Sequence, residues 1–245
     1  MEFCDHALTQ LEGPLRKPRH ALQTLQNTIV RCRLCPRLVE WRERVACEKV
    51  RRFRAQTYWG RPIPAFGDPE ASLVLIGLAP AAHGGNRTGR MFTGDRSGDW
   101  LYEALYSFGF ANQKTSRERN DGLLLSGCWI TAAVRCAPPA NRPLPGELAA
   151  CSRYLRTEIS LLPKAVVFVA LGRIAFTAFL KAWAGTSRTP PGFESAFGHD
   201  RQFCLPDDRW LISSYHPSQQ NTLTGRLTRP MFHRVFRRAR GLLGS

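Results

Sequence analysis

The sequence contains no run of eighteen apolar residues, the length at which a helix begins to span a bilayer. Its N-terminal residues also lack the basic and then apolar pattern of a secretory signal, since they include Glu2, Asp5 and Glu12. Neither the GxGxxG nor the GxxxxGKS/T nucleotide fingerprint occurs. We therefore expect a cytoplasmic protein with no membrane partner and with neither of these phosphate-binding loops.

Acidic residues are scarce, because 19 Asp and Glu stand against 35 Lys and Arg and give a formal net charge of +16. A field of this sign concentrates phosphate backbones around a protein, so the charge indicates a polyanionic partner. Lysine is scarce too, with only five residues. Arginine suits phosphate better than lysine does, but codon bias produces the same ratio, so only the total charge enters this prediction.

The length of 245 residues and the hydrophobic content of 43% allow a large core. We expect one domain over 19–245. A weakly ordered lead is expected over 1–18, where Gly13-Pro14 and Pro18 break any helix.

Four apolar runs predict buried strands, at 72–77, 128–134, 165–172 and 210–215. Helical patterns begin at Arg19 and then cover 98–109, 145–161, 173–183 and 230–242. This alternation predicts an α/β protein of three layers, with a central four-stranded parallel sheet and helices on both faces. Segments 112–122 and 185–200 are expected to be surface loops. Ligands bind such sheets beyond the carboxyl ends of the strands, where polar segments follow all four predicted strands here.

The segment 77–98, called the glycine-rich loop below, follows the first predicted strand and contains six glycines and one proline. Glycine permits positive φ and the close approach of a ligand, so the segment predicts a rigid binding loop. A plain surface loop is the alternative, although loops of this length in compact domains are usually functional or disordered. Its polar side chains are candidates for a site: His83, Asn86, Arg87, Thr93, Asp95 and Ser97.

The eight cysteines indicate a metal or cluster site before disulfides, because disulfides are rare in unsecreted proteins. Cys32 and Cys35 form a close pair at the end of the first helix, and Cys136 and Cys151 follow the second predicted strand. Four such thiolates can bind an iron-sulfur cluster or zinc. The other four are expected to be buried apolar residues or inert thiols: Cys4, Cys47, Cys128 and Cys204.

His216 follows the fourth predicted strand and precedes Pro217, in surroundings too polar for a core. A functional role is therefore favoured over that of a buried structural histidine. Farther along, the basic segment 226–240 includes Arg226, Arg229 and Arg234, and a basic collar at 31–54 holds nine Arg and Lys against three Glu. Each run can be a solvated helix face, but the net charge favours contact with phosphates.

Three long motifs resemble those of the type B (family 5) uracil-DNA glycosylases: GLAPAAHGGNRTGRMFTGD, TAAVRCAPPAN and SYHPSQQNTLTGRLT. The resemblance runs from about Val30 to Arg240, and the four-cysteine pattern is also similar to that of family 4 enzymes. It implies the same sheet and the hydrolytic removal of a deaminated base from DNA. It further implies a structural 4Fe-4S cluster on Cys32, Cys35, Cys136 and Cys151.

By motif position, the resemblance implies that Asp95, Asn141 and His216 are catalytic and that Phe92 stacks on a flipped base. Other base-binding residues are expected at Gly77, Ala79, Pro80, His83, Asn86 and Ala132. These residue types suit the reaction, in which negative charge grows on the base and positive charge on the sugar. His216 can donate a hydrogen bond to the base, Asp95 can stabilise the sugar and orient water, and Asn141 can hold either.

Ala132 departs from the family 4 pattern, in which an asparagine within Thr-Asn-Val reads the edge of uracil. This chain has Thr131-Ala132-Ala133, and the absence of the asparagine is typical of type B enzymes. Base selection is then left to stacking, backbone groups and shape. We expect removal of uracil, hypoxanthine and xanthine from double-stranded DNA in base excision repair, with no obligate protein partner.

Two alternatives remain open. One is a non-catalytic iron-sulfur protein that binds damaged or single-stranded nucleic acid, and the other is a zinc-ribbon interaction module on an α/β core. Asp95 argues against the first, because a carboxylate in a DNA groove repels phosphate and adds nothing to binding alone.

Overall fold

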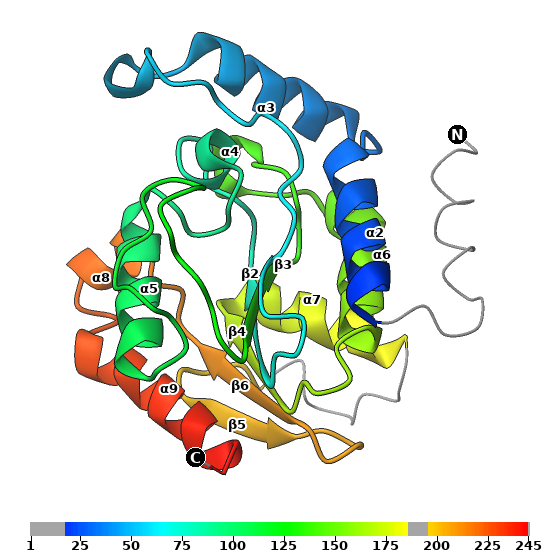
Figure 1. Cartoon of the computed structure of the whole chain (residues 1–245), viewed down its shortest axis with the longest axis vertical. Coiled ribbons are helices and arrows are strands. Elements are labelled where there is room, and N and C mark those ends of the chain that lie inside the picture. The colour runs from blue at the N-terminus through cyan, green and yellow to red at the C-terminus, as the bar shows by residue number, and fades with distance from the viewer. Residues whose placement is uncertain (1–17, 186–195, 245) are drawn as a thin grey trace.

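The computed structural model describes residues 18–185 and 196–244 (Figure 1). Residues 1–17 of the predicted lead and 186–195 of the predicted loop at 185–200 lie outside the described residues. Segment 112–122 forms no helix or strand, as predicted. Among the described helices, none is long and apolar enough to cross a membrane.

The described residues form one sheet of six strands in the order β1-β3-β2-β4-β6-β5. Its four central strands are parallel and confirm the prediction: β2 (Leu73–Gly77), β3 (Cys128–Ala132), β4 (Val167–Leu171) and β6 (Trp210–Ser214). Two short antiparallel edge strands, β1 (Phe66–Gly67) and β5 (Arg201–Cys204), were not predicted. The sequence signal is weak at both, because β1 has two residues in a proline-bearing segment and β5 is mostly exposed.

The long predicted helices are all present, as α2 (Pro18–Arg31), α5 (Arg96–Ser107), α6 (Pro145–Ser160), α7 (Arg173–Ala184) and α9 (Arg229–Leu242). The structure adds α3 (Pro36–Glu48), α4 (Gly85–Thr88), α8 (Gln219–Leu223) and the 3-10 turns η2 (Arg51–Phe53) and η3 (Pro139–Asn141). Helix α3 escaped prediction because its buried side includes the charged residue Arg42 beside Leu38 and Val45.

Alternate residues of each central strand belong to opposite cores. Leu73 and Leu75 of β2 belong to a core shared with α5 and α9. Val74 and Ile76 belong to a second core shared with α6 and α7. Residues buried on both faces explain why the central strands are continuous apolar runs, and the three predicted layers are confirmed.

A buried polar network attaches α2 to this frame. The Glu158 carboxylate of α6 accepts hydrogen bonds from Gln26 at 2.8 Å and from Thr131 at 2.5 Å, and it pairs with Arg135. Gln26 in turn accepts a hydrogen bond from the Ala65 backbone at 2.6 Å. A buried carboxylate is tolerated when such partners satisfy it, so these contacts hold α2, α6 and the end of β3 in one arrangement.

Candidate active site

Phe92 is held in the glycine-rich loop by two close approaches that only glycine permits. A methyl group on Gly77, the last residue of β2, would lie 2.9 Å from Cζ of the Phe92 ring. One on Gly98 would lie 1.8 Å from the Phe92 carbonyl oxygen. Phe92 itself has φ of 53°, a left-handed conformation that is costly for an aromatic residue. The loop therefore fixes the aromatic ring at the carboxyl end of β2.

His216 lies against this ring, with 5.8 Å between the ring centres and 29° between their planes. Its carbonyl oxygen accepts a hydrogen bond from the Asn221 side chain at 2.9 Å, which fixes the turn after β6. Burial lowers the pKa of His216 to about 4. The imidazole is consequently neutral near pH 7 and can donate one N–H without carrying a charge.

Asp95 is the N-cap of α5, and its Oδ1 accepts a hydrogen bond from the Gly98 backbone at 3.0 Å. This cap explains why α5 begins at Arg96, before the predicted start at residue 98. Oδ2 lies against Gly84, where a methyl group would approach to 2.3 Å. Burial raises the pKa of Asp95, while the N–H groups of Gly98 and Ser97 oppose that rise. The carboxylate is thus partly desolvated, which strengthens its interaction with nearby positive charge.

Ala132 ends β3 directly opposite Gly77 of β2 in the parallel pairing. Its side chain is fully buried in the same core as Phe92. The sheet therefore places the methyl group of Ala132 on the same side of the sheet as Phe92, and the role of Ala132 in base binding stays a prediction.

A cavity of about 360 Å³ opens beside His216. Its walls include Leu78, Tyr215, Asn221 and Arg226, and neither Asp95 nor Phe92 lines it. Asn221 and Gly172 were missed as site residues by sequence reasoning. A signal existed for both, because Asn221 lies in the polar segment after the fourth strand and Gly172 ends the third.

The family model of the uracil DNA glycosylase superfamily matches residues 64–240, which is most of the chain. The chain belongs to the uracil-DNA glycosylase superfamily. It is 52% identical over 218 residues to a type-5 uracil-DNA glycosylase of Thermus thermophilus, covering 89% of this chain and 96% of that protein. It is 50% identical over 214 residues to one of Mycobacterium bovis, covering 87% and 78%. It is 45% identical over 223 residues to one of Pyrobaculum aerophilum, covering 91% and 93%. The resemblance drawn from the motifs is confirmed.

Not every predicted residue of this superfamily member faces Phe92. Asn86 is fully buried, and its side chain donates to the Arg42 carbonyl of α3 at 3.1 Å. Ala79 packs in a small core with Leu38 of α3, so it too lies toward that helix. These two residues join the glycine-rich loop to α3.

His83 and Pro80 contact other parts of the loop region. Nδ1 of His83 is hydrogen-bonded to the Tyr58 hydroxyl at 3.1 Å, and burial lowers the pKa of His83 with help from Arg52 and Arg87. Pro80 packs closely on Gly85, where a methyl group would approach to 2.8 Å.

Asn141 ends η3 in a left-handed conformation with φ of 55°, next to Ala140 at 51°. Its side chain is exposed and forms no hydrogen bond with the described residues. The structure therefore does not bring Asn141 into contact with Asp95 or His216, and its catalytic role stays a prediction.

The three candidate DNA-binding arginines differ in their surroundings. Arg226 lines the cavity beside His216, with its guanidinium 4.8 Å from the centre of the Tyr215 ring. Arg229 pairs with Glu103, and Arg234 pairs with Asp200 at 3.2 Å. Arg226 is thus the one of these three that lies at the candidate active site.

Cys32, Cys35, Cys136 and Cys151 line one small cavity between α2, α3, α6 and the end of β3. The Arg42 guanidinium donates a hydrogen bond to Sγ of Cys136 at 2.9 Å. Burial raises the pKa of the Cys136 thiol to about 11, and Arg42 opposes the rise. No three or more His, Cys, Asp or Glu of the described chain are grouped closely enough to hold a single metal ion.

The remaining described cysteines lie apart from this cavity. Cys128 is buried in β3, whereas Cys47 and Cys204 are exposed. Cys4 falls outside the described residues.

Proposed function

We propose that this protein is a DNA glycosylase that removes uracil by hydrolysing its N-glycosidic bond. One observation supports this most directly: the glycine-rich loop holds an aromatic ring against a neutral histidine and places a partly desolvated carboxylate three residues later. The names of its type-5 relatives agree with this activity.

Each group has a part that its surroundings suit. A base flipped from the helix stacks on Phe92, and His216 donates its N–H to the oxygen on which negative charge develops. A neutral imidazole does this without first forming an ion pair that would also stabilise the ground state. Asp95 stabilises the positive charge of the sugar and orients the attacking water. Its position at the start of α5 opposes the rise of its pKa that burial causes, because the helix N-terminus favours an anion.

The test is single-turnover release of uracil from a labelled duplex, followed by alkali to cleave the abasic strand. Asp95→Ala and His216→Ala are each expected to slow release by about a hundredfold or more, with DNA affinity nearly unchanged. Asp99→Ala is the matched control, since Asp99 is an exposed carboxylate in the first turn of the same helix. A protein that binds the duplex but releases no base would be the non-catalytic binder instead.

We further propose that the substrate range includes hypoxanthine and xanthine in double-stranded DNA. Ala132 pairs with Gly77 and lies in the same core as Phe92, and its methyl group offers no hydrogen bond to a base edge. A pocket that selects bases by shape and stacking discriminates among them less than a pocket that hydrogen-bonds to their polar edges. Duplexes with each lesion, assayed with the unmodified protein and with Ala132→Asn, test this. Strict uracil specificity before the substitution would contradict it.

We also propose that the four cysteines of the shared cavity hold a structural 4Fe-4S cluster. A single zinc ion needs four thiolates about 2.3 Å from one point, and no such group is present in the described chain. A cluster binds thiolates at separate iron atoms and so fits cysteines spread around one cavity. Bound, it would join α2 and α3 to β3 and α6. Iron and sulfide analysis with the visible spectrum tests this, and stoichiometric zinc without iron would contradict it.

A further inference from the structure

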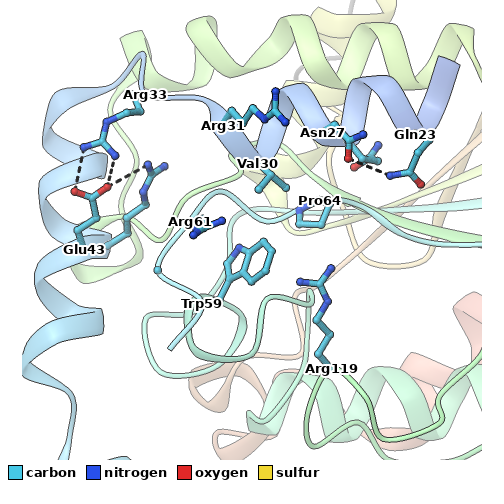
Figure 2. A pocket seen from close by; sticks show the side chains of 13 residues that line it. Gln23, Asn27, Val30, Arg31, Arg33, Glu43, Trp59, Arg61, Pro64 and Arg119 are labelled. Carbon is cyan, nitrogen blue, oxygen red and sulfur yellow. Dashed lines mark hydrogen bonds and ion pairs between the residues drawn. The ribbon is translucent and has the colours of Figure 1, made fainter. Parts of the chain in front are cut away.

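A second cavity, the arginine groove, lies between α2, segment 59–64 and loop 112–122 (Figure 2). It has a volume of about 710 Å³ and shares no lining residue with the cavity beside His216. Its walls hold five arginines and one carboxylate: Arg31, Arg33, Arg42, Arg61, Arg119 and Glu43. Both oxygens of the Glu43 carboxylate are bonded to Arg33, at 2.5 and 3.1 Å. The groove is therefore strongly cationic.

Trp59 forms an aromatic wall of this groove, as Figure 2 shows. Its indole N–H donates to the Pro62 carbonyl at 3.1 Å, and its ring packs on Gly89, where a methyl group would approach to 2.9 Å. The guanidinium carbons of Arg119 and Arg61 lie 4.4 and 5.8 Å from the ring centre. The ring thus holds two cations at the groove by cation-π attraction.

Three arginines of the groove are available to pair with an anionic ligand. Within residues 18–185 and 196–244, no carboxylate forms an ion pair with Arg31, Arg61 or Arg119. All three side chains are exposed. Solvent-facing guanidiniums without acidic partners are suited to bidentate contact with phosphate.

A buried donor at the groove wall lacks an acceptor. The side chain of Arg42 is only 2% exposed, and its Nε has no hydrogen-bond partner in the described protein. Its other nitrogens bond to Sγ of Cys136 and to the Cys32 carbonyl, and one of them pairs with Glu43 at 3.6 Å. Leaving a buried charged donor unsatisfied is costly, and Arg42 lines both the arginine groove and the cysteine cavity, so an acceptor in either would stabilise it.

We infer that the arginine groove binds an unpaired nucleotide, with its phosphate against Arg31, Arg61 and Arg119 and its base against Trp59. Aromatic platforms flanked by arginines are the common means of binding single-stranded nucleic acid. The volume lies in the range of sites for small ligands. The nucleotide belongs to a DNA strand. The assignment of this nucleotide to DNA rests on the proposed glycosylase function. The expected affinity of the groove for a nucleotide does not, because it follows from the arginines and Trp59.

The experiment measures the affinity of the full chain for a labelled, uracil-free single strand and for a blunt duplex of equal length. Arg61→Ala combined with Arg119→Ala is expected to weaken single-strand binding by about tenfold or more. The control combines Lys181→Ala with Arg201→Ala, which removes the same charge from exposed residues outside both the groove and the basic collar. The control should weaken binding by no more than about threefold, because salt largely screens charges that lie away from the bound strand.

The blunt duplex and a free nucleotide distinguish an unpaired DNA strand from the other ligands that carry the same groups. Binding of the blunt duplex should change little in the groove variant, and millimolar thymidine monophosphate should compete poorly with the strand. Equal losses in the control and the groove variant, or an equal loss on the duplex, would overturn the unpaired-nucleotide site. Competition by the monophosphate at the strand's own concentration would overturn the DNA strand as its source.

Uracil release at saturating protein keeps this inference distinct from the proposed function. The groove variant should release uracil from a duplex at the unmodified rate. A slow groove variant would make the groove part of the catalytic machinery and overturn a separate site. If the unmodified protein releases no uracil while the groove variant still loses single-strand binding, only the glycosylase function is contradicted.

Discussion

The candidate active site and the arginine groove use the glycine-rich loop in opposite ways. Phe92, His216 and Asp95 are partly or wholly withdrawn from water, and the histidine stacked on Phe92 is neutral near pH 7. In the groove, Arg61 and Arg119 stay exposed and charged over Trp59, which packs on Gly89 of the same loop. Stabilising a transition state requires polar groups in a desolvated site, whereas attracting a polyanion requires charge that faces solvent.

The largest expected effect comes from Gly98→Ala, which acts on the candidate active site alone. Its new methyl group would overlap the Phe92 carbonyl oxygen, so the ring and the Asp95 cap must both shift. We expect single-turnover uracil release to fall by about a hundredfold or more, since a displacement of about 1 Å can cost that much. Single-strand binding to the arginine groove should remain.

Gly241→Ala is the matched control, because a methyl group there meets nothing and the residue lies within α9. It should leave activity intact and raise stability by roughly 0.5–1 kcal/mol, the usual gain for alanine over glycine in a helix. Unchanged activity in Gly98→Ala would show that the fixed position of Phe92 is unimportant.

The second expected effect is a difference in pH dependence. The raised pKa of Asp95 means that this carboxylate takes up a proton at a higher pH than an ordinary aspartate. The rate should therefore fall about tenfold per pH unit below that pKa. His216, with a pKa of about 4, should produce no break near pH 6.5. Single-strand binding to the groove should lack the acid limb, because arginine stays charged throughout.

The lowered pKa of His216 also makes the folding stability depend on pH. Between about pH 6.5 and 4 the unfolded chain binds a proton at His216 that the folded chain does not. Folding stability should thus decrease as the pH falls through this window and level off below it. Denaturant unfolding of the unmodified protein and of His216→Ala measures this contribution, and identical pH profiles would contradict it.

The smallest expected effect separates two arginines of the basic C-terminal segment. Arg226→Ala should weaken duplex binding several-fold and reduce the slope of log affinity against log salt by about 0.9, the value for one lost phosphate contact. Arg234→Ala should change the slope less, because that guanidinium already pairs with Asp200, which it shares with Arg238. Titrations at several salt concentrations measure both slopes. Equal slopes for the two variants would mean that the ion pair with Asp200 does not reduce the contact of Arg234 with phosphate.

Some features of the site follow from local sequence. The apolar runs of β2 and β3, the glycines around Phe92 and the polar segment at His216 each indicate their own position along the chain. Parallel strands then bring their carboxyl ends to one edge, so Gly77 and Ala132 could be expected to meet. These inferences depended on backbone conformation and periodicity, which are properties of neighbouring residues.

Tertiary structure alone decided which polar groups face a ligand and which are already bonded. Arg226 and Arg234 look equivalent in the sequence, yet Asp200 engages only the second. Asn86 turned toward the Arg42 carbonyl, and segment 59–64 brought Trp59 beside Arg119, sixty residues away in the sequence. The sequence by itself determined the α/β frame and the loop that carries Phe92 and Asp95. Charge pairing and cavity walls were decided by packing, because they depend on partners that are distant along the chain.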